Sequence, residues 1–414
     1  MTTRIIPIIL LWMFLGGNKG VYCQNNELDH YHRSSMYLIL LKHPEQQLSD
    51  QIVDAFTKIP IPEKYNNHNL KMSVINAPIL KKMSKEEIEG AYKDAISNML
   101  DRNKIGSRLI EKWFNRDKHT GAFDMNLVKE RGFYDASIQD VQTALRTTRG
   151  TALLEDAGEE LISHTYVLVN DIRYADATLK RNLQGIGIML GMIGSAFVPG
   201  ATAFAQTIGE AGAAINDLVV GFKVYVTSYL YRLDWNNEIA TDFYSNLWFD
   251  RTNINDEKKQ LFDKNRGKYK LTYIGCTTIY SGETSLAGVK HETDMFVKVC
   301  TRSIDKAISE LQKKFDEFKV YTPLNSINPL KASIGFKEGV SEDSKYEVLE
   351  KEIDSNGRTS YKRIGIIRPI KGMIWDNRYM SAYENVTNSN LDFTTFEKIS
   401  GSNFVPGMLI REIR

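Results

Sequence analysis

The sequence GFKVYVTSYLYRLDW, residues 221–235, indicates the fold class of this 414-residue chain. Apolar and more polar side chains alternate along it, which places them on opposite faces of a β-strand. The alternating residues are Phe222, Val224 and Val226 on one face and Lys223, Tyr225 and Thr227 on the other. An earlier stretch, HTYVLVNDIRYAD at residues 164–176, is equally rich in residues that favour strands. We therefore predict that the two stretches are strands of one sheet.

The sequence around these two strands predicts an α+β fold. Helices are expected where apolar residues recur at helical spacing, at residues 48–59, 84–162 and 303–318. Further strands are expected in short runs of apolar and β-branched residues, at residues 34–44, 268–282 and 294–300. The prediction is one α+β domain over residues 34–320, with a mixed sheet and a helical subdomain at residues 84–162.

The composition changes after Pro323. TPLNSINPL, residues 322–330, has the proline and asparagine content of a linker. Short alternating runs follow, and Asn356-Gly357 between two of them is a strong signal for a β-hairpin. We predict a small β-domain over residues 324–414.

A charge-free segment separates the two strands quoted first. Residues 182–209 contain no charged side chain, and Pro199 divides them into halves that are each too short to cross a bilayer, which takes about 20 apolar residues. We predict an apolar helical hairpin inserted at residues 177–220. Its candidate contact residues are Gly187, Gly191, Gly194, Pro199, Gly209 and Gly212. The hairpin packs against its own fold, contacts a membrane through residues 183–220, or associates with itself; we favour the first, because soluble proteins rarely expose large apolar patches.

The first residues have the pattern of a secretory signal peptide. Arg4 is followed by an apolar run and then by small and polar residues. Cleavage after Cys23 would remove residues 1–23, and lipidation of Cys23 is the alternative. We favour cleavage, because the bulky Tyr22 stands where a lipoprotein peptidase needs a small residue. The pattern predicts an exported protein, periplasmic or associated with the cell envelope.

Charge and cysteine content narrow the possible partners. Removing residues 1–23 takes Arg4 and Lys19 from the 53 basic residues and none from the 51 acidic ones, so the mature chain is formally neutral. A nucleic-acid-binding protein normally carries a basic face, so this class is not expected. Only Cys276 and Cys300 would remain after cleavage. They are a candidate disulfide in an oxidising compartment, and two buried free thiols are the alternative.

Motifs for catalysis, cofactors and metals are weak. Ser303 and Lys306 match the S-x-x-K pattern of penicillin-recognising enzymes, but the companion motifs are missing, so we interpret Ser303 as a helix cap and Lys306 as solvent-facing. The glycines at 185–191 do not follow a buried strand, as a dinucleotide-binding turn requires. The histidines lack zinc-type spacing. We assign no catalytic, cofactor-binding or metal-binding residue, and we favour a role that is not enzymatic.

Aromatic residues give the remaining indication of a binding surface. Residues 229–250 are rich in tyrosine, tryptophan and acidic residues, a mixture that can stack on sugars or bind a protein. Tyr231, Trp235 and Trp248 are the candidates, although such a cluster is more often part of a core. The enzymatic alternative, a hydrolase of envelope glycans or peptides, would need a cleft shared by three acidic residues of this region: Asp234, Asp242 and Asp250.

Four stretches resemble a family of uncharacterised secreted proteins of Bacteroidota-type bacteria. They are RSSMYLILLKHP, IPIPEKYNNHNL, YVLVNDIRYAD and VYVTSYLYRLDWNNEIATDFY, and the similarity extends from about residue 33 to residue 250. The resemblance implies a bacterial cell envelope and no particular activity. We therefore expect a binding or structural protein of the envelope, whose partner is another envelope protein or a glycan.

Overall fold

The computed structural model describes residues 34–60, 64–68, 70, 73–78, 85–134, 152–176, 219–286, 292–353, 359–383 and 391–413. The predicted signal peptide and nearly all of the predicted apolar hairpin, including its six candidate residues, lie outside these ranges, so both stay predictions. Within the described part of the chain, no helix is long and apolar enough to cross a membrane.

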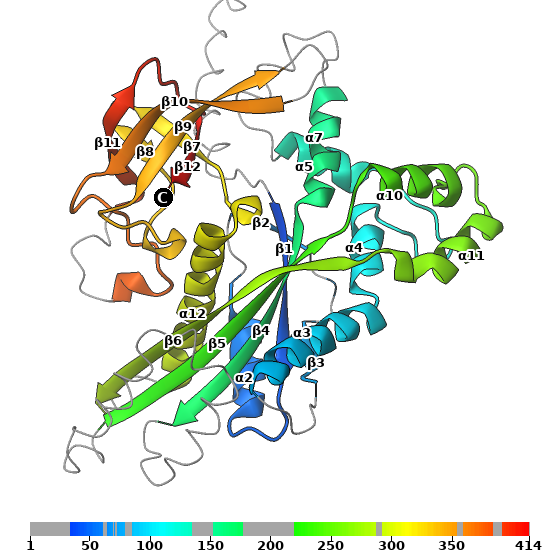
Figure 1. Ribbon diagram of the computed structural model, residues 1–414, viewed down its shortest axis with the longest axis horizontal. Helices are drawn as coiled ribbons and strands as arrows, with labels where there is room; N and C mark the ends of the chain where they lie inside the picture. Colours follow the sequence, from blue (N-terminus) through cyan, green and yellow to red (C-terminus); the bar gives the residue numbers. More distant parts are fainter. Residues whose placement is uncertain are drawn as a thin grey trace, which may run out of the picture.

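The fold is α+β, and its first part is built on a six-stranded mixed sheet (Figure 1). The strands are β1 (Ser34–Lys42), β2 (Tyr65–Asn67), β3 (Val74–Asn76), β4 (Thr165–Asp176), β5 (Val219–Leu233) and β6 (Leu271–Leu286). The order is β2-β1-β4-β5-β6, with β3 also paired to β1. β1 runs parallel to β2, β3 and β4, whereas β4, β5 and β6 are antiparallel. The prediction that residues 164–176 and 221–235 are strands of one sheet is confirmed, since β4 and β5 are neighbours.

Helices cover both faces of this sheet. The helices of the described residues are α2 (Ser49–Lys58), α3 (Lys85–Arg102), α4 (Ile105–Trp113), α5 (Asn126–Tyr134), α7 (Ala152–Ser163), α10 (Asn237–Asp242), α11 (Asp256–Asn265) and α12 (Glu292–Lys314). Short turns of other helix types are η2 (Phe243–Leu247), η3 (Arg266–Lys268), η4 (Asp316–Phe318), η5 (Phe336–Glu338) and η6 (Ser381–Tyr383). The third helix expected in the subdomain, near Ser137, lies outside the described residues.

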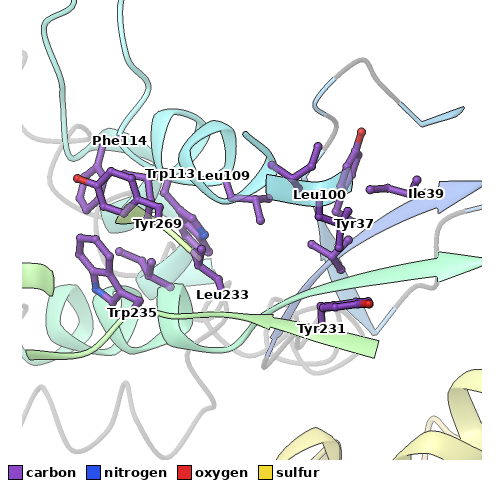
Figure 2. Packing of buried hydrophobic residues seen from close by; sticks show 14 of the residues in the cluster. Tyr37, Ile39, Leu100, Leu109, Trp113, Phe114, Tyr231, Leu233, Trp235 and Tyr269 are labelled. Atoms are coloured by element: carbon purple, nitrogen blue, oxygen red, sulfur yellow. The ribbon is translucent and has the colours of Figure 1, made fainter. Parts of the chain in front are cut away.

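The sheet has an apolar core on each side because β1 is apolar on both faces. Tyr37, Ile39 and Leu41 pack into a cluster with α3 and α4, which Figure 2 shows from close by. Met36 and Leu40 point the other way, into a cluster with α2 and α12. A strand covered on both sides reads as a continuous apolar run rather than an alternating one, as SSMYLILLK does. We call these the α3 cluster and the α12 cluster.

The structure corrects the strand predicted at residues 294–300, which is the first part of α12. Val297 and Val299 favour a strand by propensity, but the buried residues continue at helical spacing through the whole segment. Phe296, Cys300, Ile304, Ile308 and Leu311 form one apolar stripe against the sheet. Tertiary packing on the sheet therefore outweighs the local preference of the valines.

The C-terminal part is a closed, antiparallel barrel of six strands in the order β10-β11-β8-β7-β12-β9. The strands are β7 (Thr322–Ile327), β8 (Leu330–Ala332), β9 (Lys345–Ile353), β10 (Thr359–Pro369), β11 (Thr394–Gly401) and β12 (Leu409–Ile413). The β-rich character predicted for residues 324–414 is confirmed. Ile353 pairs with Thr359 around the predicted hairpin, whose tip, residues 354–358, lies outside the described residues.

The predicted linker at residues 322–330 is instead the hairpin β7–β8. Prolines and asparagines suggested a linker, yet Leu324 is fully buried in the barrel core and Ile327 pairs with Leu330. The side chain of Asn325 connects the two strands, because its Oδ1 accepts a hydrogen bond from the Ser333 backbone N–H at 3.0 Å. Pro323 and Pro329 lie near the strand ends, where a missing N–H is tolerated.

Candidate functional site

A cavity of about 330 Å³ lies between the C-terminal half of α12 and one end of the barrel. Its volume is in the range of small-molecule sites, roughly 300–1,000 Å³. The start of β7, the start of β9 and the end of β12 meet at this end of the barrel. Tyr65 of β2 and Lys64 just before it contribute from the side of the sheet, and η5 contributes from the barrel. Figure 1 shows the barrel next to one end of α12.

The cavity has an apolar lining with two tyrosine rings. Its aliphatic residues are Ile308, Val320, Ile334, Ile410 and Ile413. Tyr65 and Tyr346 are both buried, and Tyr65 stacks on Phe318 with ring centroids 5.8 Å apart. Burial raises the pKa of Tyr346 well above its usual value, and the carboxylates of Glu412 and Glu338 add to this shift. Both phenols therefore stay neutral at physiological pH, since burial also raises the pKa of Tyr65.

One stripe of α12 forms a wall of the cavity. Asp305, Ile308, Ser309, Gln312 and Lys313 recur at helical spacing and all line it. Gln312 Nε2 donates a hydrogen bond to the Tyr65 hydroxyl, which connects the helix to β2. The residues of this wall therefore lie close together in the sequence, whereas the residues on the other sides of the cavity come from other segments of the chain.

The helix is held against the barrel at the edge of the cavity. Ser309 Oγ donates to the Glu338 carbonyl at 3.2 Å, and Lys313 Nζ donates to the Gly339 carbonyl at 3.1 Å. Gly339 has a φ of +77°, and a Cβ atom there would lie only 2.0 Å from Ser309 Oγ. Glycine is required both by the left-handed backbone and by the close approach of the helix. These contacts fix the position of the α12 wall relative to the barrel.

The charges around the cavity balance. Its charged residues are Lys64, Lys313, Lys319 and Lys337 with Asp305, Glu338, Asp343 and Glu412. Glu338 Oε2 accepts hydrogen bonds from the Gly335 N–H at 2.8 Å and from Asn377 Nδ2 at 2.7 Å. Glu412 Oε1 accepts from Ser344 Oγ at 2.9 Å. With no excess of either sign, the lining suits a molecule that is uncharged or carries both charges, and the described lining residues include no histidine or cysteine.

A second polar cluster lies at the carboxyl end of β1, beside the middle of β4. Asp171 is buried, and its carboxylate accepts hydrogen bonds from His43 Nε2 at 2.9 Å, from Tyr92 Oη at 2.8 Å and from Arg173 Nε at 2.7 Å. Burial raises the pKa of Asp171, but the hydrogen bonds and the Arg173 charge outweigh it and hold the pKa below its usual value. Both oxygens of the carboxylate accept hydrogen bonds from side chains of the protein, so we assign this cluster a structural role.

The structure corrects the predicted binding surface of Tyr231, Trp235 and Trp248. Tyr231 is fully buried, and only 9% of Trp235 is exposed. Trp248 packs against the same α3 cluster, with its ring 5.6 Å from that of Phe114. Figure 2 shows Tyr231 and Trp235 among the buried side chains. The structure therefore shows the alternative considered from sequence, an aromatic core. The sequence could not decide between the two, because an abundance of aromatic residues does not reveal which side of the strand is covered.

The acidic residues of the hydrolase alternative are engaged in separate local contacts. Asp234 accepts from Thr272 Oγ1 at 2.6 Å, Asp242 pairs with Lys268 at 3.2 Å, and Asp250 accepts from Thr252 Oγ1 at 2.5 Å. They have no partner in common. Within the described residues, no group of three or more His, Cys, Asp or Glu side chains is placed to hold a metal ion. The hydrolase alternative therefore gains no support from this region.

The predicted disulfide is also corrected, because Cys276 and Cys300 are free thiols. Cys300 belongs to the α12 cluster. Cys276 pairs with Tyr229, which packs against the α3 cluster, so the two thiols lie on opposite faces of the sheet. Burial raises the pKa of Cys300 to about 12, which makes it unreactive at neutral pH. The alternative of two free thiols is the one observed, although Cys276 is only half-buried.

Two smaller interpretations can also be compared with the structure. Lys306 is exposed, as expected, but Ser303 is not a helix cap. Ser303 lies inside α12, fully buried, and donates its hydroxyl to the Val299 carbonyl at 2.7 Å. The correction follows from the earlier start of the helix, at Glu292.

Sequence reasoning did not identify the cavity as a site. Its lining comes from segments between Lys64 and Ile413, which approach one another only in the folded chain. The available signal was on α12, where Asp305, Ser309 and Gln312 recur at helical spacing on a polar side that lies next to the apolar stripe. No protein-family model matches the sequence, and no curated protein matches it either.

Proposed function

We propose that this chain is an exported binding protein whose ligand occupies the cavity between α12 and the barrel. The observation that carries the proposal is the cavity itself, which has an apolar lining, two neutral tyrosines and a balanced set of charges. Small-molecule sites combine mostly apolar walls with a few polar groups that fix orientation. The site therefore fits a small amphipathic molecule with an apolar body and either no charge or one group of each sign.

A bound molecule of this kind would contact both parts of the fold. Its apolar body would replace water against Ile308 and Ile410, and its polar groups would meet Gln312 and the lysine and carboxylate side chains at the edge. Charged edge groups then contribute more to orientation and selectivity than to affinity. A strongly anionic or strongly cationic ligand would be repelled by the half of these side chains that carry its own sign of charge.

We test the cavity with Nile red, an uncharged dye that fluoresces in apolar surroundings. The wild-type chain is expected to bind one molecule of dye. Val320→Trp places a large ring at the partly exposed Val320 position on the wall, so it should weaken dye binding about tenfold or more. Val405→Trp makes the same change at a site where the side chain is 44% exposed and should leave binding unchanged. Both affinities are read from fluorescence titrations.

Thermal unfolding curves of both variants establish that they are folded. If the folded Val320→Trp variant binds the dye as tightly as the wild type, the cavity is not the site. Native mass spectrometry of the protein purified from its own cells then identifies any molecule that occupies the cavity. A natural ligand should be displaced by the dye and absent from the Val320→Trp variant.

Export is tested on the native protein, independently of the ligand. The signal-peptide pattern leads us to expect a mature chain that begins at Gln24 and is recovered from the cell envelope or periplasm. N-terminal sequencing after cell fractionation measures both properties. Recovery of the full-length chain from the cytoplasm would refute export without affecting the ligand site.

A further inference from the structure

Tyr65 and Gln312 form a hydrogen-bonded pair on the wall of the cavity between α12 and the barrel. Gln312 Nε2 donates to the Tyr65 hydroxyl, and both side chains line the cavity. The Tyr65 ring stacks on Phe318, and the ring of Phe318 meets that of Tyr166 edge to face with centroids 4.8 Å apart. These ring contacts give the Tyr65 hydroxyl a fixed position at the wall.

The pair keeps hydrogen-bonding capacity after its own bond is formed. Among the described residues, the Tyr65 hydroxyl bonds only to Gln312, and the Gln312 amide bonds only to Tyr65. A phenol donates one hydrogen bond and accepts up to two, and the amide of glutamine has two N–H donors and a carbonyl acceptor. The pair therefore retains at least one donor and one acceptor. Turning the amide over exchanges the roles of the two residues and leaves this count unchanged.

A ligand that fills the cavity has to satisfy this pair. Only 4% of Tyr65 is exposed, and burial raises its pKa, so the hydroxyl keeps its proton at neutral pH. A polar group that a ligand covers without bonding to it weakens binding, because the group loses its hydrogen bond to water. The wall therefore favours a molecule that presents one acceptor and one donor to the same side.

A peptide in an extended conformation presents these two groups. In antiparallel strands, two opposite residues can exchange both N–H···O bonds, so the N–H and C=O groups of one extended residue point to the same side. Its side chains can meet the aliphatic lining, which includes Ile308, Ile334 and Ile410. A short free peptide also carries an ammonium and a carboxylate group, and the charged residues around the cavity have both signs.

We infer that the ligand is a short peptide in an extended conformation, one residue of which exchanges backbone hydrogen bonds with Tyr65 and Gln312. This inference rests on the proposed ligand site and adds the chemical class of the ligand to it. The pair then determines selectivity, because a site that hydrogen-bonds a polar group of its ligand rejects an analogue that lacks this group.

The tripeptide alanyl-leucyl-alanine and its ester analogue test this contact. The analogue has an oxygen atom in place of the leucine N–H, so it lacks one donor and keeps nearly the same shape. Isothermal titration calorimetry of the wild type should show that the peptide binds about tenfold more tightly than the ester. In a variant with both Tyr65→Phe and Gln312→Leu, neither side chain can bond to the backbone of the peptide, so this preference should disappear.

Tyr65→Phe alone should weaken binding of the peptide about tenfold, and Tyr321→Phe is its matched control. The Tyr321 hydroxyl accepts a hydrogen bond from Arg411 at 2.9 Å, and its ring packs in another cluster, with Leu349 and Leu409. Tyr321→Phe should therefore leave the affinity for the peptide and the preference over the ester unchanged. Thermal unfolding curves establish that all of these variants are folded.

The outcomes separate this inference from the proposed function. A wild type that binds peptide and ester equally, or a folded double variant that keeps the preference, would overturn the inference. A wild type that binds neither of them, while its binding of Nile red remains sensitive to Val320→Trp, would overturn it as well and leave the ligand site standing. Nile red binding that is unchanged by Val320→Trp would refute the ligand site itself.

Discussion

Replacing Asp171 by asparagine is expected to lower the free energy of unfolding by about 3–5 kcal/mol, as breaking a buried ion pair does. The carboxylate lies between β1, β4 and α3 and is bonded to His43, Arg173 and Tyr92. An amide cannot neutralise the guanidinium, and its NH2 group would meet hydrogen-bond donors. Urea unfolding followed by circular dichroism measures the change.

Asp50 offers a matched control for this substitution. Its carboxylate also forms an ion pair, with Lys42 at 2.8 Å, but 88% of its side chain is exposed. Asp50→Asn should therefore change the free energy of unfolding by at most about 1 kcal/mol. Equal effects of the two substitutions would contradict the structural role of the Asp171 cluster.

The same carboxylate gives the stability a defined dependence on pH. Its pKa is lower in the folded chain than the usual value of 3.8, so ionised Asp171 stabilises the fold above that value. The contribution is lost as the pH falls from about 4 through the pKa of the folded state. The stability difference between the wild type and Asp171→Asn should therefore be full at pH 7 and smaller at pH 3. A difference that stays constant over this range would exclude the ionised carboxylate as its source.

Truncating Trp113 is the second substitution with a large expected effect. Trp113 is fully buried on α4, and its Nε1 donates to Thr165 Oγ1 at 2.9 Å. The centroid of its ring lies 4.6 Å from that of His68, in an edge-to-face arrangement. Trp113→Ala should lower the free energy of unfolding by about 3–5 kcal/mol, because it leaves a large cavity in the α3 cluster. Figure 2 shows this side chain between α4 and the sheet.

Trp113→Phe separates the hydrogen bond from the packing. Phenylalanine keeps much of the ring volume and removes the donor to Thr165, so its cost should be smaller than that of alanine, with about 1 kcal/mol from the lost hydrogen bond. Chemical denaturation of both variants, under the same conditions, gives the two values. A cost for alanine no greater than that for phenylalanine would show that packing of this ring contributes little.

The strands of the sheet could be predicted because their signals are local. The alternation in β5 and the apolar run of β1 each identify a strand, and the apolar run of β1 also indicates that both of its faces are covered. The start of α12 could not be predicted from the sequence, because Val297 and Val299 favour a strand. Only contact with the sheet reveals the helical stripe. The hairpin β7–β8 was hidden for a related reason, because its prolines and asparagines resemble a linker until their burial is known.

The candidate site was less predictable than the fold. The aromatic residues around Trp235 attracted attention by composition, but composition does not distinguish a core from a surface. The cavity joins β2 to the far end of β12, a separation in sequence that no periodicity connects. Only its α12 wall has a local pattern, in the spacing of Asp305, Ser309 and Gln312.

The position of α12 has a mechanical consequence. Its apolar stripe anchors it to the sheet, and its other end is bonded to the turn after η5 in the barrel through Ser309 and Lys313. A ligand bound beside these hydrogen bonds would contact α12 and the barrel at the same time. Because such a ligand binds only when both walls of the cavity are folded, its binding free energy would stabilise the α12 cluster and the barrel together against heat.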